Sequence, residues 1–84
     1  MIISKKLLGE KLKEMYENAP QNEQVLMIHL FGIKFANIMR ENGYNAREII
    51  DAAGIRNSYQ TELSKGIKMS KYVEIKKDKD TFSL

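Results

Sequence analysis

The sequence predicts a mainly α-helical fold, a compact helical bundle, from three observations. Apolar residues recur at helical spacing through most of the 84 residues. Glycine or proline follows each of these periodic segments. The stretch GIRNSYQTELSKG, from Gly54 to Gly66, has the glycine, the polar cap and the inward apolar pair that are typical of the turn and second helix of a helix-turn-helix.

A first helix is expected from Ser4, whose hydroxyl can cap it, to the residue before Pro20. Lysines alternate with glutamates on its outer face, which is therefore expected to be solvated. Its inward positions, at helical spacing, are Leu8, Leu12, Met15, Tyr16 and Ala19.

The next segment, QVLMIHLFGIKFANIMREN, is the most apolar part of the chain, and its start is ambiguous. In a nearly continuous apolar run such as Val25 to Phe31, periodicity does not separate a buried strand from a buried helix. We expect a strand at Gln24 to Met27 and a helix from Ile28 to Asn42 that Gly43 ends. The inward stripe of this helix is Ile28, Phe31, Phe35, Ile38 and Met39.

A short helix is predicted from Ala46 to Ala53. Asn45 is a good N-cap, and Glu48 three residues later can complete a capping box. Gly54 stands where a left-handed residue would close the helix.

The next helix follows directly and is expected to end at Gly66. Asn57 or Ser58 would cap it, Ile55 would anchor the turn in the core, and Tyr59 and Leu63 would point inward one turn apart. The outer face has side chains of the kind that contact base edges and phosphates in the major groove. These are Ser58, Gln60, Thr61, Ser64 and Lys65.

The segment from Tyr72 to Lys76 alternates with the period of a half-buried strand. Paired with Gln24 to Met27, it would form a minimal two-stranded sheet similar to a wing. We expect a single helix-turn-helix-like domain over residues 1–77 and a polar C-terminal tail over residues 78–84.

The charge of the chain is unevenly distributed. Between Arg56 and Lys77 there are six basic and two acidic residues, a net charge of +4, whereas the rest of the chain carries −1. The excess therefore coincides with the second helix of the helix-turn-helix and the segment after that helix, where phosphate contacts would be needed. The N-terminus has no sustained apolar run, so we expect no signal peptide, no membrane association and a cytoplasmic location.

Residue types that carry catalysis or bind metals are scarce. The chain has no cysteine, and its only histidine, His29, lies in an apolar run. One histidine without thiolates or converging carboxylates does not make a metal site, so the expected role of His29 is a partly buried side chain with a hydrogen-bond partner. No glycine-rich phosphate loop is present. We expect no enzymatic activity, no cofactor, no bound metal and no small-molecule ligand.

The segment from Gly54 to Gly66 resembles the helix-turn-helix of phage-repressor-like regulators, in which a glycine, an apolar residue, a polar cap, a Ser-Tyr-like step, an inward leucine and a closing glycine recur in this order. Two residues depart from that pattern. Ile50 stands where that family prefers a small alanine, and Gln60 stands where it usually has a buried Ile or Val. The whole chain also resembles small bacterial proteins with an HTH-like domain, through MIHLFGIKFA and LSKGIKMSKYVEIK.

The resemblance and the outer face together predict sequence-specific binding of double-stranded DNA, as in a small transcriptional regulator. The residues expected to contact DNA are Arg56, Asn57, Ser58, Gln60, Thr61, Ser64, Lys65, Lys68 and Lys71. The alternative is a protein-protein interaction module that keeps the fold without binding DNA. Glu62, which would lie close to phosphates, and the moderate basic excess support it, but Glu62 is also compatible with DNA if it accepts a hydrogen bond from the N4 amine of cytosine, so it does not decide between the two. Regulation by so small a chain would require a homodimer or a protein partner. Its candidate apolar surface is Ile2, Ile3, Leu7 and Phe82.

Overall fold

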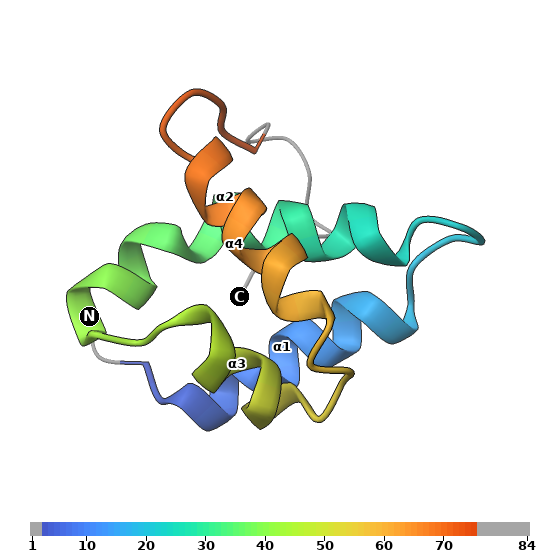
Figure 1. Cartoon of the computed structure of the whole chain (residues 1–84), viewed down its shortest axis with the longest axis horizontal. Coiled ribbons are helices and arrows are strands. Elements are labelled where there is room, and N and C mark those ends of the chain that lie inside the picture. Colours follow the sequence, from blue (N-terminus) through green and yellow to red (C-terminus); the bar gives the residue numbers. More distant parts are fainter. Residues whose placement is uncertain (1–2, 76–84) are drawn as a thin grey trace.

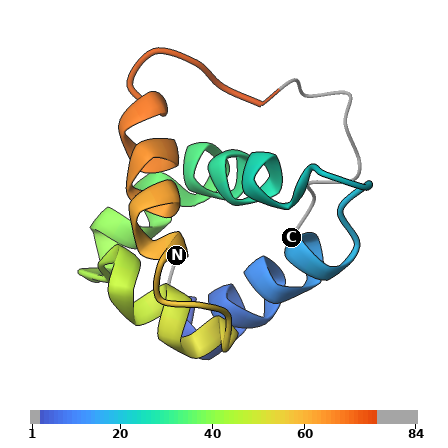
Figure 2. The ribbon, with the colours of Figure 1, turned by 45° about the vertical axis from the view of Figure 1, so that its right-hand side comes forward.

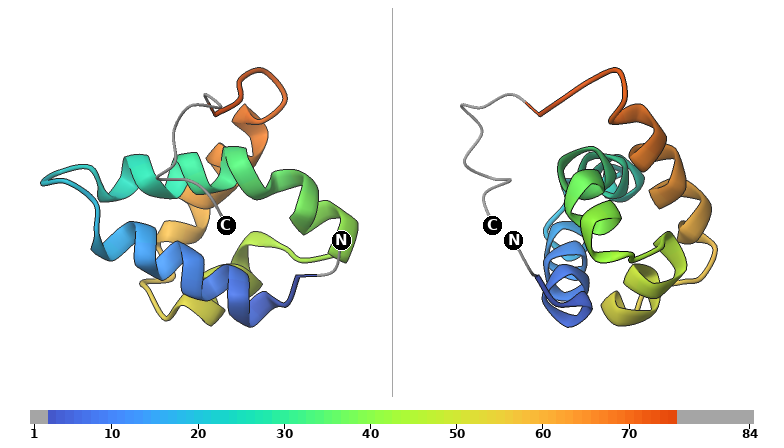
Figure 3. Two further views of the ribbon diagram at one scale, coloured as in Figure 1. Left: turned by 180° about the vertical axis from the view of Figure 1, so that it is seen from behind. Right: turned by 90° about the vertical axis from the view of Figure 1, so that its left-hand side faces the viewer.

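The computed structural model describes residues 3–75, and this part of the chain folds into four helices (Figure 1). They are α1 (Lys5–Glu17), α2 (Gln24–Asn42), α3 (Ala46–Ala53) and α4 (Tyr59–Met69). α1 and α2 run in opposite directions, and α3 packs on α1 while α4 crosses α2 (Figures 1 and 2). Seen along α2, both α3 and α4 lie on the same side of the α1–α2 pair (Figure 3). The predicted helical bundle is confirmed.

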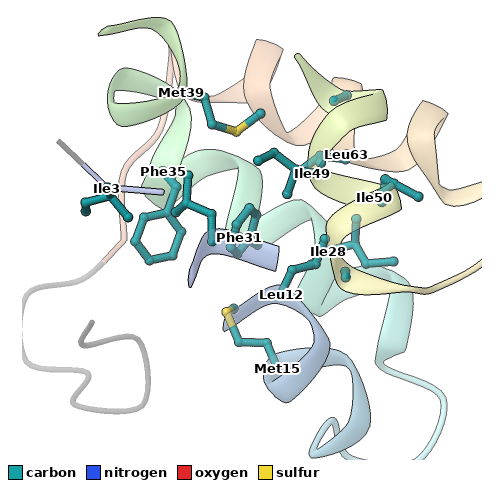
Figure 4. Close-up of a cluster of buried hydrophobic side chains, with 13 residues drawn as sticks. Ile3, Leu12, Met15, Ile28, Phe31, Phe35, Met39, Ile49, Ile50 and Leu63 are labelled. Carbon is teal, nitrogen blue, oxygen red and sulfur yellow. The ribbon is translucent and has the colours of Figure 1, made fainter. Parts of the chain in front are cut away.

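One hydrophobic core joins all four helices (Figure 4). The rings of Phe31 and Phe35 lie at its centre with their centroids 4.7 Å apart. Leu63 of α4 and Ile49 of α3 are fully buried against this cluster. Its members include residues predicted from helical spacing, namely Leu8, Leu12, Met15, Ile28, Phe31, Phe35 and Met39. Helical periodicity therefore identifies the inward faces of α1 and α2.

The helix ends follow local sequence chemistry. The Ser4 hydroxyl oxygen accepts a hydrogen bond from the backbone N–H of Leu7 at 3.0 Å. Asn45 and Glu48 form the predicted capping box, with both hydrogen bonds at 2.9 Å. Gly43 and Gly54 each adopt a left-handed conformation with φ of 72°, which costs glycine little because it has no Cβ.

The predicted strand at Gln24 to Met27 is wrong, because these residues form the first turn of α2. Val25 and Leu26 are 39% and 47% exposed, so the apolar run does not mark a buried strand. A helix satisfies its backbone groups internally, whereas a strand would need a partner. Residues 72–75 lie near the end of the described range and form no strand, and Lys76 lies outside it. The expected two-stranded sheet is therefore absent from residues 3–75.

Gly66 does not end α4, contrary to the prediction, and lies inside a helix that continues to Met69. A Cβ atom on Gly66 would lie 2.5 Å from the backbone oxygen of His29 in α2. A Cβ atom on Gly32 would lie 2.8 Å from the carbonyl carbon of Gly66. The backbones of α2 and α4 are thus in direct contact at their crossing, and glycine at both positions makes this approach possible.

We expect Gly66→Ala to destabilise the protein. At an ordinary position inside a helix this change would stabilise by about 1 kcal/mol. Here the added methyl would collide with the backbone of α2, and overpacking of this kind costs about 1–3 kcal/mol. Denaturant unfolding monitored by circular dichroism measures the difference. Thr61→Ala, at an exposed position of α4, is the control and should be close to neutral. A Gly66→Ala variant at least as stable as the natural sequence would contradict the close crossing.

Candidate nucleic-acid interface

The helix-turn-helix consists of α3, the turn at residues 54–58, and α4. α3 lies close against α1, because a Cβ atom on Gly9 would be 2.6 Å from the backbone of Ala52. The first turn of α4 also contacts α1: the Tyr16 and Tyr59 hydroxyl oxygens are 3.3 Å apart, and their ring centroids are 5.4 Å apart. With Leu63 fully buried, α4 is fixed to the core along one side, and the opposite side faces outward.

The structure exposes nearly all of the predicted DNA-contacting residues. Thr61, Ser64, Lys65 and Lys68 recur at helical spacing and share the outward side of α4. Ser64 is half-buried, and the other predicted residues are exposed. The turn before α4 contributes Arg56, Asn57 and Ser58, and Lys71 lies in the turn after it. Gln60 is exposed, so it does not take the buried place that the repressor-like pattern gives to Ile or Val.

The start of α4 differs from the expectation. Neither Asn57 nor Ser58 caps the helix through its side chain, because Ser58 already has helical backbone angles, with φ of −60° and ψ of −22°. The backbone carbonyls of Arg56 and Asn57 instead accept hydrogen bonds from the N–H groups of Tyr59 and Gln60, both at 3.0 Å. The exposed residue Arg56 thus stands three positions before the first residue of α4, where the positive end of the helix dipole favours an anion.

Glu62, the only acidic residue of α4, is held by two neighbours. One carboxylate oxygen lies 2.8 Å from Nε2 of His29 in α2, and the other lies 3.6 Å from Nζ of Lys65. The hydrogen bond from His29 lowers the pKa of Glu62, and the charge of Lys65 lowers it further, while partial burial raises it. The carboxylate of Glu62 thus already has partners inside the protein. The expected role of His29, a partly buried side chain with a partner, is confirmed.

Sequence reasoning misses Arg40, which local spacing places only on the outer face of its helix. Its Nη2 atom lies 3.4 Å from the hydroxyl oxygen of Ser70, just beyond α4. Thirty positions separate the two residues, and no local pattern links them. The expected apolar surface is only partly present: Leu7 is 45% exposed, but Ile3 is 5% exposed and belongs to the core. Ile2 and Phe82 lie outside the described residues.

The family model of the HTH-like domain matches residues 4–76. The chain belongs to the HTH-like domain family. This match covers all four helices, so the HTH-like domain is the entire described fold and not α3 and α4 alone. Comparison with curated proteins and with solved structures finds no match.

The described part of this HTH-like domain shows neither a membrane-spanning helix nor a metal site. None of the helices in residues 3–75 is both long enough and apolar enough to cross a membrane. In the same residues, no group of three or more histidine, cysteine, aspartate or glutamate side chains is arranged to hold a metal ion.

The pairing of Glu62 makes a pH-dependent contribution to stability. Because the folded-state pKa of Glu62 lies below its ordinary value of 4.5, the contribution is complete above that value and is lost as pH falls through the folded pKa. The melting temperature of Glu62→Gln should therefore fall less steeply than that of the natural protein on acidification below about pH 5. Glu41→Gln removes an exposed carboxylate that has no ion pair within residues 3–75, and it should keep the natural profile. Identical acid profiles for Glu62→Gln and the natural protein would contradict the role of the pair.

Proposed function

We propose that this HTH-like domain binds double-stranded DNA in a sequence-specific manner through α4, as a small transcriptional regulator. The observation that carries the proposal is the composition of the outward side of α4. It presents hydrogen-bonding side chains and lysines, while the one carboxylate of the helix is hydrogen-bonded to His29 of α2. Membership of the HTH-like family supports the same function.

The roles of individual residues follow from the chemistry of the major groove. Gln60 can pair in a bidentate manner with N6 and N7 of adenine, and the hydroxyls of Thr61 and Ser64 can contact base edges. Arg56, Lys65, Lys68 and Lys71 would neutralise phosphates, and Asn57 and Ser58 would contact the backbone from the turn. All of these side chains except the half-buried Ser64 are exposed, which supports their availability to DNA.

The proposal covers the domain over residues 1–77 and assigns no function to the tail at 78–84. We further propose a cytoplasmic protein without catalytic activity or cofactor. Residues 3–75 contain one helix-turn-helix, and recognition of a two-fold symmetric operator by this domain would therefore require a homodimer. A protein partner is the other means by which so small a domain could influence transcription.

A protein-protein interaction module is the second candidate, and one observation favours it. Val25 and Leu26, at the start of α2, are 39% and 47% exposed and lie next to each other. Exposed apolar side chains of this kind can serve as a protein contact. They lie in the first turn of α2 and are not among the residues proposed to contact DNA, so a protein contact there is compatible with DNA binding.

Selection of bound sequences from a random duplex library tests the proposal directly. Enrichment of a motif over several rounds is expected if α4 recognises base edges. Binding without any enriched motif would show that the protein contacts phosphates and does not recognise base edges. No binding to any duplex at low salt would overturn the proposed function in favour of the interaction module.

Gln60→Ala should separate recognition from electrostatic attraction. Because Gln60 is exposed, the melting temperature should hardly change, while discrimination at one base pair of the selected motif should fall by about 1–3 kcal/mol. Binding to unrelated duplexes should be retained. Lys68→Ala, at an exposed position about two turns later, is the matched comparison and should weaken binding to all duplexes alike. Competition titrations with the selected duplex and single-base variants provide the measurement. An unaltered motif for Gln60→Ala would show that Gln60 contacts no base.

A further inference from the structure

We propose that Arg40, in the last turn of α2, is an additional phosphate contact that extends the DNA interface beyond the helix-turn-helix; this inference rests on the proposed function. The first support is the way its side chain is held. Nη1 donates to the side-chain oxygen of Asn37 at 2.6 Å, and Nη2 donates to the hydroxyl oxygen of Ser70 at 3.4 Å. The Ser70 hydroxyl in turn donates to the backbone oxygen of Ile67 at 2.5 Å. The guanidinium is thus directed to the C-terminal end of α4.

The second support is its charge. Arg40 is exposed and has no carboxylate partner among residues 3–75, so its positive charge is available to a ligand. Lys68 and Lys71 are also exposed and stand within two positions of Ser70, the residue that Arg40 contacts, so the end of α4 carries further positive charge. Glu74 is the one acidic side chain that lines the neighbouring hollow with Asn37 and Ser70, and it leaves this region with a positive balance.

The third support is the order of the contacts between α2 and α4, which follow one another along both helices. His29 contacts Glu62 from the N-terminal half of α2, Gly32 touches Gly66 at the crossing, and Arg40 contacts Ser70 from the last turn. His29 and Arg40 are eleven residues apart, about 16 Å along the helix axis. One half of α2 therefore donates a hydrogen bond to the carboxylate of α4, while the other adds a cation beyond the end of α4. At that place a backbone phosphate is the expected neighbour, since base edges lie along the helix itself.

A merely structural role for Arg40 is the alternative, because a cation in the last turn of a helix interacts favourably with the helix dipole. The two roles differ in their dependence on salt. A phosphate contact contributes about −0.9 to the slope of log affinity against log salt, whereas a structural contribution to α2 leaves this slope unchanged.

The test uses the full chain and a fluorescently labelled duplex, the selected motif or, without one, a random-sequence duplex. Anisotropy titrations between about 50 and 200 mM salt give the slope. For Arg40→Ala we expect weaker binding to every duplex and a slope smaller in magnitude by about 0.9. The natural protein therefore binds more tightly than the variant by a factor that falls about threefold as salt rises over this range. Arg40→Gln, which keeps a polar side chain of similar length but removes the charge, should give the same slope as Arg40→Ala.

Lys13→Ala is the matched control, since it removes from α1 one exposed positive charge that has no ion pair within residues 3–75. It should leave the slope unchanged. Asn37→Ala removes the acceptor that holds Nη1 and should give an intermediate loss of affinity with the charge retained. Natural slopes for both Arg40 variants, with duplex binding intact, would overturn the inference alone. Absence of duplex binding by the natural protein would overturn the inference together with the proposed function.

Discussion

The contact between the backbones of α2 and α4 at Gly32 and Gly66 is the constraint on which the rest of the structure depends. Helix axes usually lie 8–10 Å apart because side chains separate them. Here neither glycine has a side chain to separate the helices, and the backbone of Gly66 lies against that of His29. This approach buries Leu63 and brings Glu62 within 2.8 Å of His29. The position of the proposed DNA-contacting helix is therefore set by α2.

A second close approach supports α3 in the same way. Gly9 of α1 lies against Ala52 and Ala53, while the ion pair between Lys5 and Glu48, at 3.0 Å, joins the same two helices at the surface. This ion pair is exposed and contributes little, so the glycine contact and the burial of Ile49 and Ile50 hold α3. Each helix of the helix-turn-helix is thus fixed to a helix outside it, which pre-organises the outward side of α4 before any ligand binds.

Local features of this fold can be predicted from sequence, and contacts between distant residues cannot. The capping box at Asn45 and the left-handed glycines at Gly43 and Gly54 depend on a few neighbouring residues, and the sequence predicts them all. Gly66 suggests a helix end because glycine has the same local signature at a helix end and at a helix crossing. The predicted start of α2 is wrong for a related reason: a run of apolar residues does not reveal that Val25 and Leu26 lie beyond the core.

In the candidate site, too, local features can be predicted from sequence and contacts between distant residues cannot. Helical spacing predicts which side chains of α4 are exposed, because Tyr59 and Leu63 define the inward side. The contacts that residues of α2 make with α4 and its C-terminal end cannot be predicted, since His29 and Glu62 are 33 positions apart and Arg40 and Ser70 are 30 apart. Sequence therefore leaves open whether Glu62 lies near phosphates or accepts from a cytosine amine, whereas the structure shows its carboxylate held by His29 and Lys65.

The residue at position 50 explains why α2 has this influence. In the phage-repressor-like pattern that the Gly54–Gly66 segment resembles, a small alanine at this place packs against the second helix, whereas here the place belongs to Ile50, which is 1% exposed. The smallest residues lie instead where α2 meets α4 and where α1 meets α3. α4 accordingly packs more extensively on α2 than on α3. The proposed interface is therefore best regarded as α4 together with the helix beneath it, because α2 supplies both the partner of Glu62 and the additional cation at Arg40.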